Sequence, residues 1–112
     1  MKISIFGTGY VGLVTGASLA NLGHDVLCVD VDEKKIHLIN SGEMPFYEPG
    51  LKELVLKNKE RARLIFSTDI EGAVHFAEVI FNCVGTPMKD DGSAELKYVF
   101  DVTKKVALSA KE

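Results

Sequence analysis

Short runs of apolar residues alternate along the chain with longer segments in which apolar positions recur at helical spacing. The short runs predict β-strands at residues 3–6, 26–30, 64–66 and 79–84. The longer segments predict helices at residues 11–22, 33–40, 49–58, about 70–77 and about 94–110. Strands that alternate with helices are typical of βα units on a parallel sheet, so the pattern predicts an α/β fold.

Local signals mark the ends of these helices. Gly23 follows the first predicted helix, where a glycine commonly ends a helix. Asp32 is placed to cap the second helix. Pro49 fits the first turn of the third, where the missing N–H group of proline costs no hydrogen bond. Ser67 or Thr68 can cap the fourth.

The order of the strands follows from the handedness of their connections. Right-handed crossovers predict the order 3-2-1-4, as in part of a Rossmann-type doubly wound sheet with helices on both faces. The fourth strand, at residues 79–84, is an uninterrupted apolar run that we expect to be covered on both faces, yet it lies at an edge. We therefore expect more chain or a second subunit to pair with it. Residues 1–112 would then form one truncated domain of a homo-oligomer.

Three glycines follow the first predicted strand directly and open the first predicted helix. Gly7, Gly9 and Gly12 have the spacing G-x-G-x-x-G in the context that a dinucleotide-binding fingerprint requires. Gly7 permits a tight turn, Gly9 lets a pyrophosphate approach the backbone, and Gly12 lets the helix pack closely on the strand. The N–H groups of Tyr10 and Val11 at the helix start suit a phosphate. The alternative is a purely structural glycine turn.

An acidic residue at the end of the second predicted strand favours the dinucleotide interpretation. Asp30 stands at the distance from the glycines where the fingerprint places the carboxylate that holds the ribose hydroxyls. Because a carboxylate repels a 2′-phosphate, Asp30 predicts NAD rather than NADP. Lys35, on the first turn of the next helix, either reaches the same ribose or is a solvated surface lysine. A cation there also suits a 2′-phosphate, which argues in the opposite direction.

Composition narrows the class of partner. The 112 residues contain 13 Lys plus Arg and 16 Asp plus Glu, and a net charge of −3 does not attract nucleic acid. The most apolar segment, residues 10–22, is too interrupted to span a membrane, and the chain opens on a predicted strand rather than an export signal. Cys28 and Cys83 fit buried thiols in a reducing compartment. We expect a cytoplasmic protein without membrane or nucleic-acid partners, and no metal site, because the histidines lack ligand spacing.

A second glycine-containing turn follows the fourth predicted strand. Gly85, Thr86 and Pro87 lie at the rim where open α/β sheets bind ligands. Thr86 either donates a hydrogen bond to the cofactor or belongs to an ordinary turn in which Pro87 ends the strand. These residues by themselves leave both interpretations open.

These segments together carry a resemblance that covers nearly the whole chain. The sequence resembles the NAD-binding domain of the UDP-glucose and GDP-mannose 6-dehydrogenase family at residues 7–12, 28–32, 35–36, 45–51, 67–69 and 84–87. The Tyr-Glu-Pro-Gly-Leu segment at residues 47–51 separates this family from hydroxyacyl-CoA and hydroxyisobutyrate dehydrogenases, which share the glycine pattern. Residues 12–16 and 46–51 look more like the UDP-glucose enzymes than the GDP-mannose enzymes.

The resemblance implies a cofactor and a reaction. It implies NAD held by Gly7, Gly9, Tyr10, Val11, Gly12, Asp30, Lys35 and Thr86. It implies oxidation of UDP-glucose to UDP-glucuronate by two hydride transfers to two NAD molecules, through a thioester on a cysteine. Cys28 and Cys83 do not match that nucleophile, so we expect no catalytic residue in this chain and no turnover by the chain alone. A GDP-mannose or other nucleotide-sugar 6-dehydrogenase, and a stand-alone non-catalytic nucleotide-binding module, are the alternatives.

Overall fold

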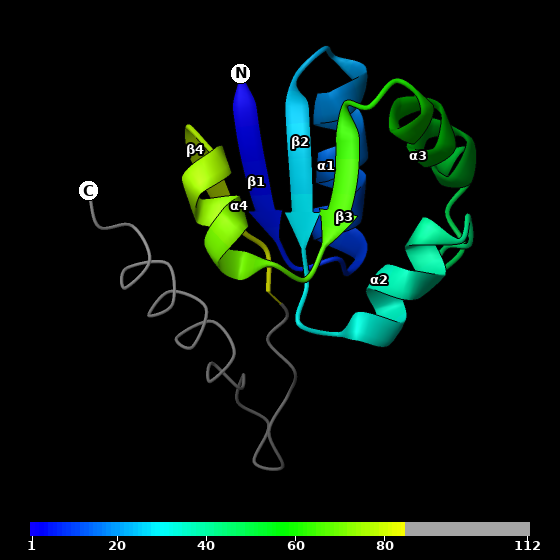
Figure 1. Cartoon of the computed structure of the whole chain (residues 1–112). Coiled ribbons are helices and arrows are strands. Elements are labelled where there is room, and N and C mark those ends of the chain that lie inside the picture. Colours follow the sequence, from blue (N-terminus) through cyan, green and yellow to red (C-terminus); the bar gives the residue numbers. More distant parts are fainter. Residues whose placement is uncertain (85–112) are drawn as a thin grey trace, which may run out of the picture.

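The computed structural model describes residues 1–84, and Figure 1 shows the strands side by side with helices packed around them. The elements are β1 (Lys2–Phe6), α1 (Tyr10–Asn21), β2 (Asp25–Val29), α2 (Glu33–Asn40), α3 (Leu51–Glu60), β3 (Leu64–Ser67), α4 (Ile70–Phe76) and β4 (Val79–Asn82). The predicted loop and helix between residues 85 and 110 lie outside the described residues.

The strands form one parallel sheet in the order β3-β2-β1-β4, which confirms the predicted topology. In the register of the sheet, Ile5 of β1 stands between Cys28 of β2 and Phe81 of β4. The carboxyl ends of β1 and β2 therefore lie next to each other, and the turns that follow them share one edge of the sheet. Dinucleotides bind at that edge in open α/β sheets.

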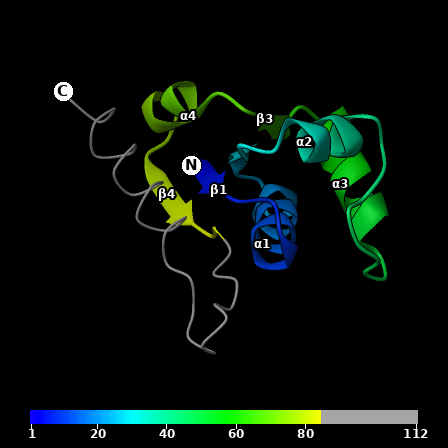
Figure 2. The same ribbon diagram turned by 90° about the horizontal axis from the view of Figure 1, so that it is seen from below.

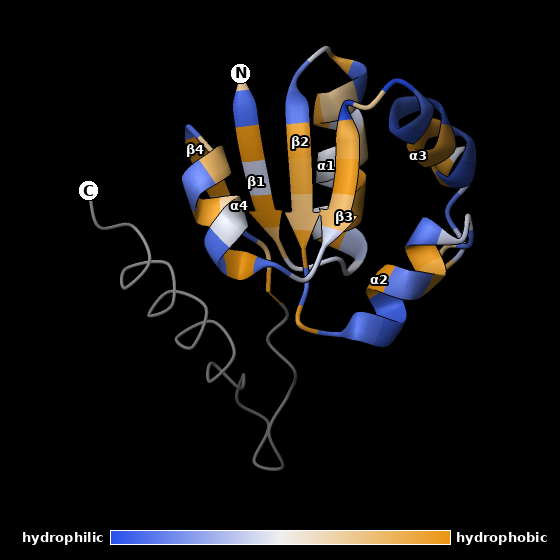
Figure 3. Cartoon of the chain, viewed as in Figure 1, coloured by the Kyte–Doolittle hydropathy of each residue, from blue (hydrophilic) through white to orange (hydrophobic). Residues whose placement is uncertain are grey.

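Helices cover the two faces of the sheet unequally. Seen from below in Figure 2, α1 lies on one side of the strands and α4 on the other. The larger core joins α1, α2 and α3 to side chains such as Ile5 and Cys28, and the smaller one joins α4 to Phe6 and Val29. Figure 3 shows the matching concentration of hydrophobic residues along the strands. The alternation of side chains along β1 and β2 thus divides the apolar residues between two cores.

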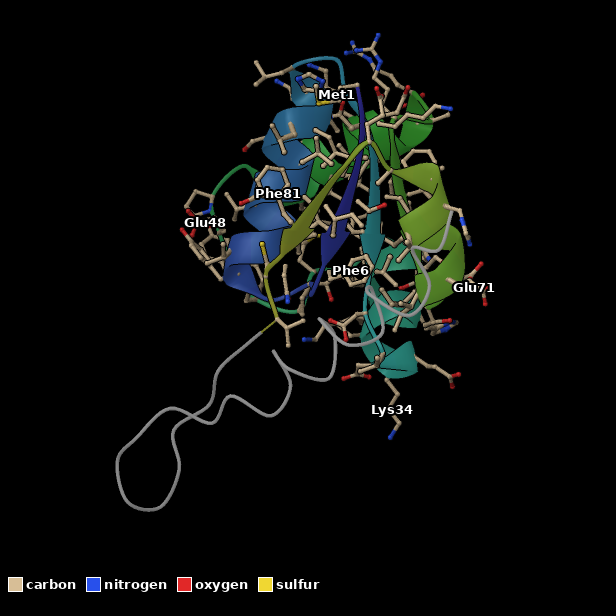
Figure 4. The ribbon with its side chains drawn as sticks, turned by 90° about the vertical axis from the view of Figure 1, so that its left-hand side faces the viewer. Met1, Phe6, Lys34, Glu48, Glu71 and Phe81 are labelled. Carbon is tan, nitrogen blue, oxygen red and sulfur yellow. The ribbon has the colours of Figure 1, made fainter. Side chains whose placement is uncertain are left out.

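Strand β4 is less covered than its apolar sequence predicts. Within residues 1–84 it pairs only with β1, so it forms the predicted edge, but it ends at Asn82 rather than at residue 84. Val79 is 36% exposed and Phe81 40% exposed, so the expectation of cover on both faces is wrong for the described residues. Figure 4 labels Phe81 on this edge strand. The apolar run at residues 79–84 is typical of a buried strand, but within residues 1–84 only β1 lies beside β4.

The start of α3 differs from its predicted start. Gly50 is the N-terminal cap residue with φ 81°, and its carbonyl oxygen accepts the first helical hydrogen bond, from the N–H of Leu54 at 3.1 Å. Pro49 therefore lies before the helix, and the prediction that it occupies the first turn is wrong. The left-handed backbone at Gly50 redirects the chain between Pro49 and the helix, a conformation that favours glycine.

Two helix caps can be compared with their predictions. The Asp32 side chain accepts hydrogen bonds from the N–H groups of Lys34 and Lys35, which confirms the cap of α2. At α4 the cap is Asp69, whose carboxylate accepts from the Gly72 N–H at 3.0 Å. Ser67 instead accepts from the Asp69 N–H at 3.0 Å, so the prediction of Ser67 or Thr68 as cap is wrong. A serine two residues earlier in the chain shapes the turn that brings Asp69 into place.

Candidate dinucleotide-binding site

The turn between β1 and α1 needs two of its glycines for reasons internal to the protein. Gly7 has φ 106°, and a Cβ atom there would lie 2.6 Å from the carbonyl oxygen of Cys83. A Cβ atom on Gly12 would collide with the carbonyl oxygen of Gly7. The tight turn and the close approach of helix to strand, which the sequence predicted for these positions, are therefore both present.

Gly16 is a third glycine with a packing role, and the sequence analysis did not single it out. A Cβ atom there would lie 2.7 Å from Sγ of Cys28 and 3.3 Å from Cδ1 of Ile5. Gly16 follows Gly12 by one helical turn, and that spacing is the signal that could have revealed it. The two glycines together let the whole first half of α1 lie close to β1 and β2.

Gly9 differs from these positions because nothing in the described protein requires a glycine there. Its backbone is extended, with φ −76° and ψ −164°, and a Cβ atom would have no heavy atom within 4 Å. The space in front of Gly9 is open to a ligand that approaches the backbone. In addition, α1 has no side-chain cap and no acidic residue in its first turn. Its first N–H groups and the positive end of its dipole are therefore well placed for an anion.

The carboxylate of Asp30 is held in place from three directions. Its Oδ2 atom accepts hydrogen bonds from Thr8, at 2.9 Å from the backbone nitrogen and 2.7 Å from Oγ1. Its Oδ1 atom accepts from the N–H of Asp32 at 2.9 Å. The ammonium group of Lys35 lies 3.8 Å from Oδ2. The structure thus brings the predicted residues Asp30 and Lys35 together with the turn that carries Gly7 and Gly9.

These contacts decide the charge of Asp30. Burial of the carboxyl group would by itself raise its pKa. The hydrogen bonds from the Asp32 N–H, the Thr8 hydroxyl and the Thr8 N–H, and then the charge of Lys35, outweigh burial and lower the pKa below its ordinary value of 3.8. Asp30 is therefore a negative charge at neutral pH, fixed beside the glycine turn.

Thr8 is the residue of this site that sequence reasoning missed. Its side chain is 0% exposed, and both of its donors are used on Asp30. The fingerprint allows any residue between its first two glycines, so the local pattern gave no sign of this contact. Only the pairing of β1 with β2 brings Thr8 to a partner 22 positions away in the sequence.

Tyr10 and Val11 lie at the start of α1 and point largely into solvent. They are 55% and 62% exposed, respectively. The Tyr10 ring packs on the ring of Phe46, with centroids 5.5 Å apart and planes inclined by 47°. The segment before α3 therefore returns to the start of α1 through Phe46. Phe46 and Tyr47 also line an open depression of about 450 Å³, which lies between this segment and the start of α3. We found no signal for this contact in the sequence.

Thr86 belongs to the predicted site but lies outside the described residues. The part of the chain that leads toward it ends beside the glycine turn, because the Cys83 N–H donates to the carbonyl oxygen of Phe6 at 2.7 Å. The carbonyl oxygen of Cys83 also occupies the space that a Cβ atom on Gly7 would need. Strand β4 therefore delivers the chain to the same edge of the sheet as β1 and β2.

Comparison with known proteins agrees with this geometry. Residues 1–112 match the UDP-glucose/GDP-mannose dehydrogenase family, NAD binding domain. The chain belongs to this family. Its cofactor is NAD, and the parallel sheet with order 3-2-1-4 is the Rossmann-type fold of its structural relatives.

Individual relatives of this NAD-binding domain include enzymes for two sugar nucleotides. UDP-glucose 6-dehydrogenase YwqF of Bacillus subtilis is 48% identical over 111 residues, which are 99% of this chain and 25% of that protein. A ternary complex of GDP-mannose dehydrogenase from Pseudomonas aeruginosa has a TM-score of 0.95 at 44% identity, over 100% of this chain and 26% of that one. A UDP-glucose dehydrogenase from Pyrobaculum islandicum has a TM-score of 0.90 at 37% identity, over 96% of this chain and 25% of that one.

The domain spans about a quarter of the length of these relatives. The described residues fit NAD in two respects: open space lies in front of Gly9, and a fixed carboxylate stands at Asp30 beside the same turn. Among the helices of residues 1–84, none is long and apolar enough to cross a membrane.

Proposed function

We propose that this NAD-binding domain serves a UDP-glucose 6-dehydrogenase and holds NAD between the glycine turn and Asp30. The observation that carries the proposal is the position of the Asp30 carboxylate, fixed by hydrogen bonds from the residue between the first two glycines. Gly7, Gly9 and Gly12, with the N–H groups of Tyr10 and Val11, would receive the pyrophosphate. The complete set of proposed residues is Gly7, Gly9, Tyr10, Val11, Gly12, Asp30, Lys35 and Thr86.

The division of work within this set follows from charge. The negative Asp30 suits the hydroxyl groups of the adenosine ribose and repels a 2′-phosphate, which supports NAD as the preferred dinucleotide. Lys35 lies within 3.8 Å of Asp30, so its cation is partly engaged before any ligand arrives. Support for Thr86 comes from the position of Cys83 beside Gly7, shortly before Thr86 in the chain. When bound, NAD supplies the hydride acceptor for oxidation of a sugar alcohol.

UDP-glucose is the proposed substrate of the whole protein. Support comes from the 48% identical UDP-glucose 6-dehydrogenase of Bacillus subtilis and from the family-like segments at residues 12–16 and 46–51. GDP-mannose is the second candidate, because the GDP-mannose 6-dehydrogenase of Pseudomonas aeruginosa is 44% identical over the full length of this chain. The oxidation of C6 to a carboxylate, with two NAD reduced per sugar, is the family reaction that we propose for the whole protein.

A substrate comparison tests the proposal. The full-length protein is incubated with NAD and either UDP-glucose or GDP-mannose, and NADH and the uronate product are both measured. We expect two NADH per UDP-glucuronate formed, and little reaction with GDP-mannose or with NADP. Turnover of GDP-mannose alone would move the protein to the second candidate. NAD binding without turnover of either compound would leave a dehydrogenase for another sugar nucleotide or a non-catalytic nucleotide-binding module, and a wider set of sugar nucleotides would separate these two.

Assembly and location belong to the same proposal. Within residues 1–84 the edge at β4 is open and Phe81 is 40% exposed, which supports pairing with more chain or with another subunit. Pairing with another subunit is the case that gives the proposed homo-oligomer. Light scattering of the full-length protein at several concentrations tests the oligomeric state, and a monomer at all concentrations would contradict the proposed homo-oligomer.

The proposed cytoplasmic location rests on the free thiols of Cys28 and Cys83 and is tested by cell fractionation.

A further inference from the structure

Two hydroxyl groups of the described chain are fully buried, and their hydrogen bonds differ in kind. Ser4 and Thr8 are both 0% exposed. Ser4 Oγ donates to the backbone carbonyl of Ala73 at 2.7 Å, a contact that ties β1 to α4. Thr8 Oγ1 donates at the same distance to Oδ2 of Asp30, an ionised side chain at the candidate site. The Ser4 contact joins two elements of the fold, whereas the Thr8 contact holds the Asp30 carboxylate at the edge of the sheet where the dinucleotide is proposed to bind.

The lone pairs of the Asp30 carboxylate are used unevenly. Oδ2 accepts from both the N–H and the hydroxyl of Thr8, at 2.9 Å and 2.7 Å. Oδ1 accepts from the N–H of Asp32 at 2.9 Å. A carboxylate oxygen has about two acceptor positions, so Oδ2 is filled by Thr8 while Oδ1 retains one. Thr8 thereby decides which oxygen remains available to a ribose hydroxyl.

We infer that Thr8 is a positioning and specificity-determining residue for the dinucleotide, because it fixes the Asp30 carboxylate relative to the glycine turn. The inference rests on the proposed role of Asp30. The backbone of Thr8 lies between Gly7 and Gly9, so one residue joins the pyrophosphate turn to the ribose carboxylate. A carboxylate already held in its binding orientation loses less conformational freedom when the ligand arrives. Its charge also stays where a 2′-phosphate would have to lie.

The test compares Thr8→Val with Thr8→Ser in the full-length protein. Valine has nearly the shape of threonine but lacks the hydroxyl, whereas serine keeps it. Calorimetric titrations give the dissociation constants of NAD and NADP. We expect Thr8→Val to lower the affinity for NAD about tenfold, as for loss of one hydrogen bond to a charged group. The affinity for NADP should fall less. We expect Thr8→Ser to restore most of the NAD affinity and of the preference over NADP.

A double-mutant cycle shows whether Thr8 acts through Asp30. In an Asp30→Asn background the effect of Thr8→Val on NAD affinity should fall to less than about twofold, because the charge to be positioned is gone. An undiminished effect in that background would overturn the inference and assign Thr8 to the phosphate turn alone. If Asp30→Asn itself leaves NAD affinity and the NAD/NADP ratio unchanged, the proposed role of Asp30 fails, which is a separate result.

Ser4→Ala is the matched control for loss of a buried hydroxyl. It should lower the free energy of unfolding as Thr8→Val does, without changing the ratio of the NAD and NADP dissociation constants. The ratio of the two dissociation constants is the decisive measurement, because partial unfolding lowers the affinities for NAD and NADP equally. Should Thr8→Val fail to fold, Thr8→Ala removes the same hydroxyl without added apolar contact. An unchanged ratio in the folded variant would overturn the inference.

Discussion

The ammonium group of Lys35 lies 3.8 Å from Oδ2 of Asp30, so the two residues form an ion pair. The carboxylate of Asp30 favours NAD, whereas the cation of Lys35 would suit the 2′-phosphate of NADP. Both side chains are mostly covered, with 31% of Lys35 and 13% of Asp30 exposed. A cation paired in this way is less available to a 2′-phosphate than a free lysine. The ion pair therefore supports the proposal that Asp30, rather than Lys35, sets the preference between NAD and NADP.

Removing the carboxylate should reverse this balance. In Asp30→Asn the repulsion of a 2′-phosphate is lost and Lys35 is freed to bind it, so we expect the NADP/NAD affinity ratio to rise by about tenfold or more. Fluorescence or calorimetric titration with both dinucleotides measures the ratio. In Asp30→Asn combined with Lys35→Ala, most of that gain should disappear.

Lys34 provides the control for this prediction. Figure 4 shows Lys34 extending from α2 away from the rest of the protein. Lys34→Ala should therefore leave the binding of both dinucleotides nearly unchanged in wild-type and Asp30→Asn proteins. An equal response to Lys34→Ala and Lys35→Ala would mean that only the general positive charge of α2 matters, and not the ion pair.

The glycines of the turn should separate into binding and folding positions. Gly9→Ala places a Cβ atom in open space, so it should weaken NAD by about tenfold or more while costing little stability. Gly12→Ala drives a Cβ atom into the carbonyl oxygen of Gly7, so it should lower the free energy of unfolding by about 2 kcal/mol or more. Urea denaturation and NAD titration of both variants measure the two effects. Equal loss of stability in both would contradict the assignment of Gly9 to ligand contact.

Acid should remove the stabilisation that Asp30 provides. The pKa of Asp30 is lower in the folded protein than its ordinary value of 3.8. The unfolded chain therefore binds the proton more readily, so the contribution is complete above about pH 5 and is lost as the pH falls through 3.8 toward the folded pKa. We expect the stability difference between wild type and Asp30→Asn to shrink below about pH 4 in urea titrations. Asp25→Asn, at the exposed start of β2, controls for loss of one negative charge.

The two cysteines should react with alkylating reagents at very different rates. Burial, and secondarily the neighbouring Cys83, raise the pKa of the Cys28 thiol to about 12. Because the thiolate is the nucleophile, Cys28 should be unmodified by iodoacetamide at pH 8 until the protein unfolds. Cys83 is only half-buried and should react first. Peptide mass mapping with and without urea measures both sites, with Cys83→Ser as control. Rapid labelling of Cys28 in the folded protein would show that α1 separates from β2.

Much of the fold could be predicted from the sequence because the relevant signals are local. Strand and helix positions follow from apolar spacing, and the parallel order follows from the handedness of the crossovers. Asp32 is confirmed as a cap because a cap and the N–H groups that it binds lie within one helical turn. Gly7 and Gly12 could be recognised because the fingerprint is contiguous. The predictions for Pro49 at the start of α3 and for the cap of α4 were wrong. Gly50 and Asp69 are neighbouring residues that can also begin these helices, and the local pattern does not show which residue takes the cap position.

The contacts that join distant segments were decided by the tertiary structure alone. Thr8 meets Asp30 and Gly16 meets Cys28 only because β1 and β2 pair in one register and α1 lies across them. Tyr10 meets Phe46 in the same indirect way. The sequence by itself determined the order of the elements, the glycine turn and the acidic residue, since each is written in adjacent positions. Which side chain holds that acid, and how far it is shielded from water, depended on the packing of elements that no local pattern relates.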